Sequence, residues 1–235
     1  MKRFYQQTGI VPTASGYGVA LDGKPIKTPA KQPLVIPNAA LAGAIAAEWE
    51  AQQGEIRPAQ MPLTRLASTA IDRVTPQREL IVQQIADYAG TDLVCYRAVH
   101  PPALAMRQHA VWQPLADWAA LRYDAPLEIA AGVVPKPQPE ASLRAFAAAV
   151  AEQNDFALAA LHLVTGACGS LVIALALIEG RLDAAEAYAI SQLDESFQIE
   201  AWGKDEEQAE RRRVLATDIA AAAQFISLLR APTGG

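Results

Sequence analysis

The chain has 235 residues, of which 51% are hydrophobic and 19% are charged, and its formal net charge is −5. This supply of apolar side chains excludes disorder over the whole length, and the acidic balance argues against a general nucleic-acid binder, which would present a basic field. The two cysteines, Cys95 and Cys168, are too few for a disulfide scaffold and have no CxxC spacing, so a reducing compartment is the simplest interpretation.

The first forty residues predict β structure. Asp22-Gly23 separates two short runs, 17–21 and 24–28, and predicts a hairpin because both central residues of a type I′ turn need a positive φ. Pro25 limits the second run to an edge strand or a strand start. Residues 33–37, bounded by prolines, predict another short strand.

Helical patterns follow. Asn38 is a suitable N-cap for a helix over 39–53, and the apolar residues of 63–74 recur at i, i+3 and i+4. Thr75-Pro76 then predicts the N-cap and first residue of a helix that continues to Tyr88. Residues 90–96 fit a strand or a helix equally well. We therefore expect residues 1–98 to form an N-terminal α+β domain, with β-hairpins followed by helices.

His100-Pro101-Pro102 is the strongest linker signal in the chain. Beyond it, a helix is expected around 104–118, then a short extended excursion bounded by prolines. Four further helices are predicted over 140–152, 155–179, 183–201 and 205–229. Residues 99–235 are therefore expected to form an all-α orthogonal helical bundle, and the fold class of the whole chain is α+β.

Residues 156–178 contain no Asp, Glu, Lys or Arg, and 23 residues could span a bilayer. The stretch carries His162 and Thr165, however, and no basic cluster flanks it. We favour a buried central helix over a membrane span. Gly166, Gly169 and Ser170 are interpreted as small residues that let another helix approach closely.

Residues that could carry catalysis are scarce. The three histidines have no metal-ligand spacing, neither cysteine has a partner ligand nearby, and no phosphate-binding glycine motif occurs. The sequence therefore predicts no catalytic residue, no metal and no cofactor.

Charge is distributed unevenly along the chain. Residues 1–40 hold five Lys/Arg against one Asp, whereas residues 183–210 hold nine Asp/Glu against one Lys. Two interpretations remain open for the acidic segment. It is either a solvated face whose acids complement a helix N-terminus, or a docking surface for a basic partner with Trp202 as its aromatic anchor.

Several short motifs resemble a known family. In chain order they are Arg3-Phe4-Tyr5, residues 16–29 (GYGVALDGKPIKTP), Ala47-Glu48-Trp49, 61–66 (MPLTRL), 69–73 (TAIDR), 90–97 (GTDLVCYR), Gly169-Ser170-Leu171, Leu193-Asp194-Glu195 and 202–206 (WGKDE). Together they cover nearly the whole chain and resemble the ATP synthase F1 complex assembly factor 2 family. Ser68, Gln113, Tyr188 and Phe197 depart from the family pattern, and Gln113 lacks the carboxylate expected there.

The resemblance implies a chaperone without enzymatic activity. Its partner would be the unassembled α subunit of the ATP synthase catalytic sector, held until the α/β hexamer forms. It also favours the docking interpretation of the acidic segment, and the residues expected to bind the partner are Asp194, Glu195, Glu200, Trp202, Asp205 and Glu206. No secretory signal or transit peptide precedes the motifs, which suggests a bacterial member or a mature organellar chain. We expect a bacterial member to work in the cytoplasm and organellar relatives to work in the mitochondrial matrix.

One alternative remains. A small-molecule enzyme or binding protein could use a cleft between the two domains, with Asp72, Asp92 and Asp194 as its carboxylates. A plain helical scaffold is a weaker third possibility. The oligomeric state is left open.

Overall fold

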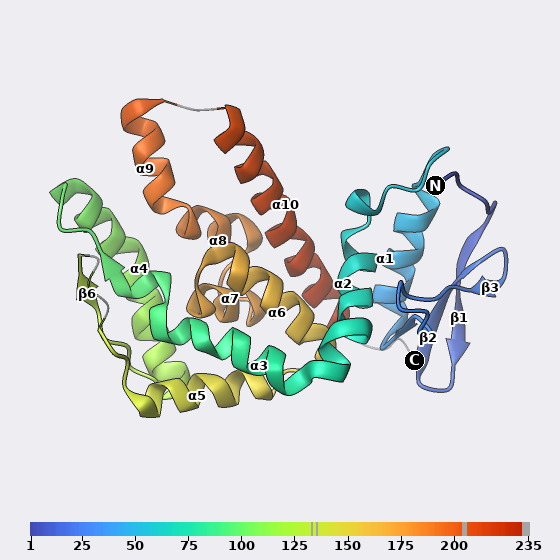
Figure 1. Ribbon diagram of the computed structural model, residues 1–235, viewed down its shortest axis with the longest axis horizontal. Coiled ribbons are helices and arrows are strands. Elements are labelled where there is room, and N and C mark those ends of the chain that lie inside the picture. The colour runs from blue at the N-terminus through green and yellow to red at the C-terminus, as the bar shows by residue number, and fades with distance from the viewer. Residues whose placement is uncertain (133, 135, 204–205, 232–235) are drawn as a thin grey trace. The chain divides into compact units, whose positions relative to one another are not determined.

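The computed structural model describes residues 1–132, 134, 136–203 and 206–231 (Figure 1). Its contacts divide the chain into two compact units, and each is described by itself. The first unit comprises Met1–Arg78, Asn154–Ala160 and Gln224–Gly235, and the second comprises Glu79–Gln153 and Leu161–Ala223. Within the described ranges, no helix combines the length and apolar character needed to cross a membrane.

A small antiparallel sheet is the basis of the first unit. Strand β2 (Gly16–Leu21) pairs with β1 (Thr8–Thr13), β3 (Lys24–Pro25) and β4 (Val35–Ile36). The predicted hairpin is confirmed, because Leu21 pairs with Lys24 and the φ angles of Asp22 and Gly23 are 48° and 77°. Strand β1 has no counterpart among the predicted elements, since its glycine and proline obscure the alternation typical of a strand.

Helix α1 (Ala39–Glu50) contacts β1, β2 and β4. Asn38 caps it as predicted, because its Oδ1 accepts a hydrogen bond of 2.9 Å from the Leu41 amide. The same side chain donates from Nδ2 to the carbonyls of Leu228 and Leu229, at the end of α10. One asparagine therefore satisfies backbone groups at the start of one helix and the end of another.

The helical run after α1 differs from the prediction. α2 (Pro62–Thr69) passes into a π-turn (Ala70–Val74) and a 3₁₀ turn (Thr75–Gln77) before α3 (Arg78–Ala86). The predicted N-cap at Thr75 is therefore wrong, because this residue has helical backbone angles and its hydroxyl donates to the Ala70 carbonyl instead. Further 3₁₀ turns cover Pro58–Gln60, Asp87–Thr91 and Leu93–Cys95.

Helices dominate the second unit. They are most of α3, α4 (Pro102–Tyr123), α5 (Glu140–Ala151), most of α6 (Asp155–Cys168), α7 (Leu171–Ile178), α8 (Ala184–Ser191), α9 (Leu193–Trp202) and most of α10 (Glu206–Leu229). A short parallel pair of strands, β5 (Tyr96–Arg97) and β6 (Ala130–Ala131), joins them, so the expectation of an all-α bundle is corrected in this detail. The α+β class of the whole chain is confirmed.

The apolar stretch forms two helices rather than one. Gly169 has a φ of +63°, which ends α6, and the Ser170 hydroxyl caps α7 by accepting a 3.0 Å hydrogen bond from the Ile173 amide. Every residue of α7 is buried, so the expected buried central segment is confirmed. Gly169 and Ser170 break the helix; they do not admit a neighbouring one.

The predicted helix over 183–201 is also divided. Its break lies at Gln192, whose φ and ψ of −105° and 24° leave the helical region between α8 and α9. The predicted domain boundary at residue 98 stays a prediction. The two compact units separate between Arg78 and Glu79. The first unit also includes the start of α6 and the end of α10, where Phe156 stacks on Phe225 with ring centroids 6.2 Å apart.

Candidate functional site

Several carboxylates of the motifs bind backbone groups of the protein itself. Glu48 of α1 accepts hydrogen bonds from the amides of Leu63 and Thr64, at 2.7 and 2.8 Å, and from the Thr64 hydroxyl. It thus caps α2 from outside that helix. Burial raises the pKa of its carboxyl, while these hydrogen bonds lower it.

Asp92 performs the same task in the second unit. Its carboxylate, which has no exposed surface, accepts hydrogen bonds from the Ser170 hydroxyl at 2.6 Å and from the amides of Val94 and Val172. Burial raises the pKa of this carboxyl to about 6, against the opposing effect of its hydrogen bonds. Asp92 therefore fastens the 3₁₀ turn Leu93–Cys95 to the start of α7.

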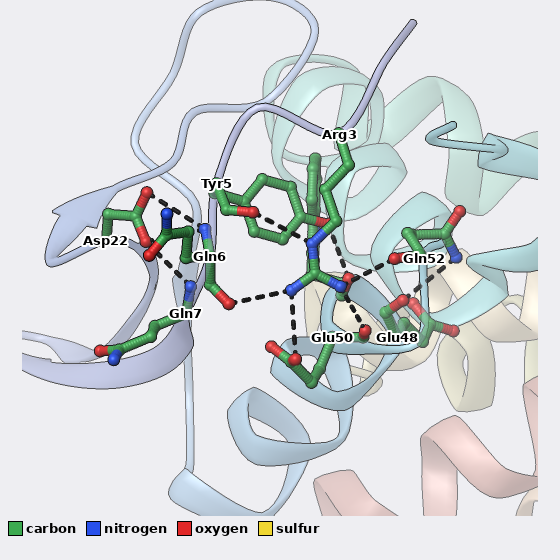
Figure 2. Close-up of polar contacts among 9 residues, drawn as sticks. Arg3, Tyr5, Gln6, Gln7, Asp22, Glu48, Glu50 and Gln52 are labelled. Carbon is green, nitrogen blue, oxygen red and sulfur yellow. Dashed lines mark hydrogen bonds and ion pairs between the residues drawn. The ribbon is translucent and has the colours of Figure 1, made fainter. Parts of the chain in front are cut away.

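An arginine clamp holds the N-terminal segment (Figure 2). The Arg3 guanidinium donates to the carbonyls of Tyr5, Gln6, Glu50 and Gln52 and pairs with the Glu50 carboxylate at 3.1 Å. Nearby, the Asp22 carboxylate accepts from the amides of Gln6 and Gln7, which lower the pKa of that carboxyl. These motif residues organise the backbone around α1 and the sheet.

The acidic surface predicted for partner binding lies mainly on α9. Glu195 and Trp202 are exposed, Trp202 at 82%, and their separation of seven residues places them on one face of the helix. Asp194 is half-buried, and its Oδ1 accepts a 2.8 Å hydrogen bond from the Gln108 side chain. Glu206 is exposed in the first turn of α10, whereas Asp205 lies outside the described residues.

Glu200 has a partner within the protein. Its two oxygens accept hydrogen bonds of 2.8 and 2.9 Å from Arg107 of α4, whose guanidinium also lies over the Phe197 ring. This bidentate pair lowers the pKa of Glu200. Glu200 therefore ties α9 to α4, while Glu195 and Trp202 are the α9 residues of the predicted set with the most open surroundings.

A groove of about 560 Å³ lies beside this surface, between α8, α9 and α10. Arg212 lines it and donates to the Tyr188 hydroxyl at 3.0 Å and to the Ser196 hydroxyl at 2.9 Å. A cation held by two hydroxyl groups thus lies beside the acidic surface. Sequence reasoning assigned no role to Arg212, because its partners lie on two other helices.

A second cavity of about 560 Å³, which we call the α1–α2 cavity, lies wholly within the first unit. Most of its lining residues come from four of the motifs that carry the resemblance: 16–29, 47–49, 61–66 and 69–73. Most of the lining is apolar, and lysine and arginine side chains stand among the exposed lining residues. The crowding of separate motifs around one cavity was not visible in the sequence, because it depends on how the hairpin, α1 and α2 pack.

The three carboxylates expected for a small-molecule site already have hydrogen-bond partners in the protein. Asp72, in the first unit, accepts from the Thr28 hydroxyl at 2.6 Å and from the Ala30 amide at 3.0 Å. In the second unit, Asp92 is inaccessible and Asp194 binds Gln108. Each of these three carboxylates therefore already accepts hydrogen bonds from the protein itself.

Neither thiol resembles a catalytic nucleophile. Cys95 and Cys168 are buried, and burial raises the pKa of each to about 12. A thiol with such a pKa is protonated at neutral pH and unreactive. In the part of the chain that the structure describes, no cluster of three His, Cys, Asp or Glu side chains could hold a metal ion.

Comparison with known proteins identifies the class. The model of a chaperone family, the ATP12 chaperone protein, matches residues 2–120. The crystal structure of Atp12 from Paracoccus denitrificans is 45% identical, with a TM-score of 0.94, covering 97% of this chain and 98% of that one. The chain therefore belongs to the ATP12 chaperone family.

Two further relatives agree. The Atu1473 protein of Agrobacterium tumefaciens is 41% identical with a TM-score of 0.94, covering 97% of this chain and 86% of that chain. The mitochondrial protein atp12 of Schizosaccharomyces pombe is 24% identical over 221 residues, which cover 89% of this chain and 76% of the relative. Similar proteins thus occur in bacteria and in a mitochondrion.

Proposed function

We propose that the protein is an assembly chaperone of the F-type ATP synthase. It binds the unassembled α subunit of the catalytic sector and prevents its aggregation before the α/β hexamer forms. Membership of the ATP12 chaperone family carries this proposal, supported by 45% identity to Paracoccus Atp12 along nearly the whole of both chains.

The physical task requires binding and release, without a chemical step. An unassembled subunit exposes apolar surface that is buried in the finished complex, and large exposed apolar patches aggregate. A chaperone that covers such a surface must later give way to the assembly partner. Moderate affinity suits this role. The two buried cysteines take no part in it.

The client-binding surface that we propose is the exposed side of α9 with the start of α10. It comprises Asp194, Glu195, Glu200, Trp202 and Glu206, with Asp205 beyond the described residues. The 82% exposure of Trp202 supports this choice, because a large aromatic side chain in water gains much from burial against a partner. We further propose that the protein works in the bacterial cytoplasm.

A direct assay tests the function. Purified α subunit is diluted from denaturant, and its light scattering is followed with and without a several-fold excess of the chaperone. The proposal predicts that scattering falls and that a chaperone–α complex is recovered by gel filtration. Unchanged aggregation together with the absence of a complex would refute it.

A further inference from the structure

We propose that the α1–α2 cavity binds a segment of polypeptide in which an apolar side chain adjoins an aspartate or glutamate. The inference rests on the proposed function only in taking this segment to belong to the client. The cavity lies in a different unit from the acidic surface of α9, and it calls for a ligand of the opposite charge.

The floor of the cavity is apolar and fixed in shape. Leu34 and Met61 line it with only 2% of their surface exposed, and Ile56 lines it at 7%. Met61 and Ile56 belong to a buried cluster with Tyr5 and Leu21, against which Ile26 and Trp49 pack. Because neighbours hold these side chains, the cavity exists before a ligand arrives, and an apolar side chain could enter with little rearrangement.

One polar atom of the lining has no partner. The Trp49 indole lines the cavity, and its Nε1 is buried without a hydrogen-bond acceptor among the described residues. A buried donor left unsatisfied typically costs about 1–3 kcal/mol. Because this atom has almost no exposed surface, a ligand could reach it only if the Trp49 side chain moved.

The charges around the cavity favour an anionic neighbour of that apolar group. Lys27, Arg65 and Arg73 are exposed lining residues, and neither Lys27 nor Arg73 forms an ion pair in the part of the chain that the structure describes. Asp72 is the only acid among the described lining residues, and its two oxygens already accept hydrogen bonds from Thr28 and Ala30. Lys27 and Arg73 are therefore cations that an anionic group of a ligand can approach.

The π-turn over Ala70–Val74 contains two charged residues of the cavity lining, Asp72 and Arg73. A π-turn widens the helix locally and changes the direction of the side chains that follow, and such turns are frequent at functional sites. Here Asp72 bonds to the loop around Thr28 while Arg73 stays exposed at the cavity. The turn thus combines a structural acid with a free cation.

Peptide binding to the isolated chaperone tests the inference. The probes are fluorescein-labelled 15-residue peptides that overlap along the α subunit, titrated by fluorescence anisotropy. We expect the bound peptides to share an apolar residue beside Asp or Glu, and Arg73→Glu to weaken them at least ten-fold. Arg57→Glu makes the same charge change at an exposed residue outside the cavity lining and should leave binding unchanged.

A second variant addresses the volume rather than the charge. Thr69→Trp places bulk at a half-buried lining position and should abolish peptide binding, with circular dichroism and the thermal midpoint confirming that the variant folds. Binding that survives both Arg73→Glu and Thr69→Trp would overturn the inference. A second result would also overturn the inference: decanoate binds to the chaperone and salt does not displace it, while no peptide binds.

The same variants separate this inference from the proposed function. If wild type suppresses aggregation of the α subunit but no peptide binds the cavity, the inference fails and the chaperone function stands. If acidic–apolar peptides bind in an Arg73-dependent manner but aggregation of the α subunit is unaffected, the cavity assignment stands and the proposed client is wrong.

Discussion

Carboxylates that stand out in the sequence bind backbone amides in the structure. Glu48 caps α2, Asp72 holds the loop at Ala30, and Asp92 caps α7. Acids at helix starts are favourable because the first amides have no partner within the helix and the dipole attracts negative charge. Acidic residues in a motif can therefore be needed for folding and need not indicate a ligand-binding site.

Asp92 should give stability a characteristic dependence on pH. Because its pKa is raised from 3.8 to about 6, the folded state binds this proton more tightly than the unfolded state. Its contribution is therefore full below about pH 4 and is lost as the pH rises through about 6. The loss is on the order of 3 kcal/mol, at about 1.4 kcal/mol per pH unit.

The comparison that isolates this effect uses Asp92→Asn, which cannot titrate. We expect the free energy of unfolding of the wild type, minus that of the variant, to fall between about pH 4 and pH 7. Urea unfolding across this range measures both values. A difference that stays flat or rises with pH would show that the folded state does not raise this pKa.

Arg3 offers a second test at the residue scale. Its guanidinium serves four carbonyls and one carboxylate, a geometry that lysine cannot reproduce with a single ammonium group. Arg3→Lys should lower the free energy of unfolding by about 2 kcal/mol, the scale of lost hydrogen bonds to a charged group. The exposed Arg57→Lys is the matched control and should change it by less than about 0.5 kcal/mol in the same urea titration.

At the scale of elements, continuous helical patterns hide interruptions. Periodicity predicts one helix over 155–179 and one over 183–201, yet both are divided, at Gly169-Ser170 and at Gln192. The first break has a local signal, because glycine followed by serine suits a helix end and a new N-cap. The second has none, since Gln192 is a fair helix former. There α8 contacts α7 whereas α9 contacts α4, so packing against different helices decides the break.

A pair of glycine substitutions tests the first break. Gly169 has a φ of +63° and open space where a Cβ would stand, so Gly169→Ala should cost about 1–2 kcal/mol from backbone strain alone. Gly166, inside α6, has an ordinary helical backbone, and its added Cβ would lie 3.8 Å from the Tyr88 hydroxyl. Gly166→Ala should be neutral or stabilising by up to about 1 kcal/mol. Equal effects in thermal or urea unfolding would contradict the assignment of Gly169 as the helix stop.

At the scale of the whole molecule, the net charge of −5 conceals regions of opposite character. The acidic surface of α9 and the cationic α1–α2 cavity belong to different compact units. If both proposed sites bind the client, the acidic surface is expected to contact its basic groups and the cavity its acidic groups. Screening by salt would weaken each contact, because exposed charges interact over about 8–10 Å at moderate ionic strength.

Charge reversal on α9 tests the proposed client surface. Glu195→Lys should weaken binding to the purified α subunit roughly five- to ten-fold at low salt, with a smaller effect at high salt. The change should leave the thermal midpoint unaltered, because Glu195 is exposed. Glu152→Lys makes the same reversal at an exposed residue after α5 and should preserve affinity. Equal affinities of wild type and Glu195→Lys would remove Glu195 from the surface.

The sequence by itself determined the α+β class, the Asp22-Gly23 hairpin, the Asn38 cap and the buried apolar segment. These features depend on local conformational preference or on a long apolar run, and both can be read from residues that are close together in the sequence. The acidic segment and its exposed Trp202 were likewise visible as composition. The motifs also sufficed to suggest the family.

Only the tertiary structure decided which residues are free to bind. Asp92 and Glu200 both stand out in the sequence as candidate acids, but one is fully buried and the other is held by Arg107. The α1–α2 cavity likewise required the hairpin, α1 and α2 to meet. The reason is physical, because burial and the supply of hydrogen-bond partners come from residues distant in sequence, and no local pattern records them.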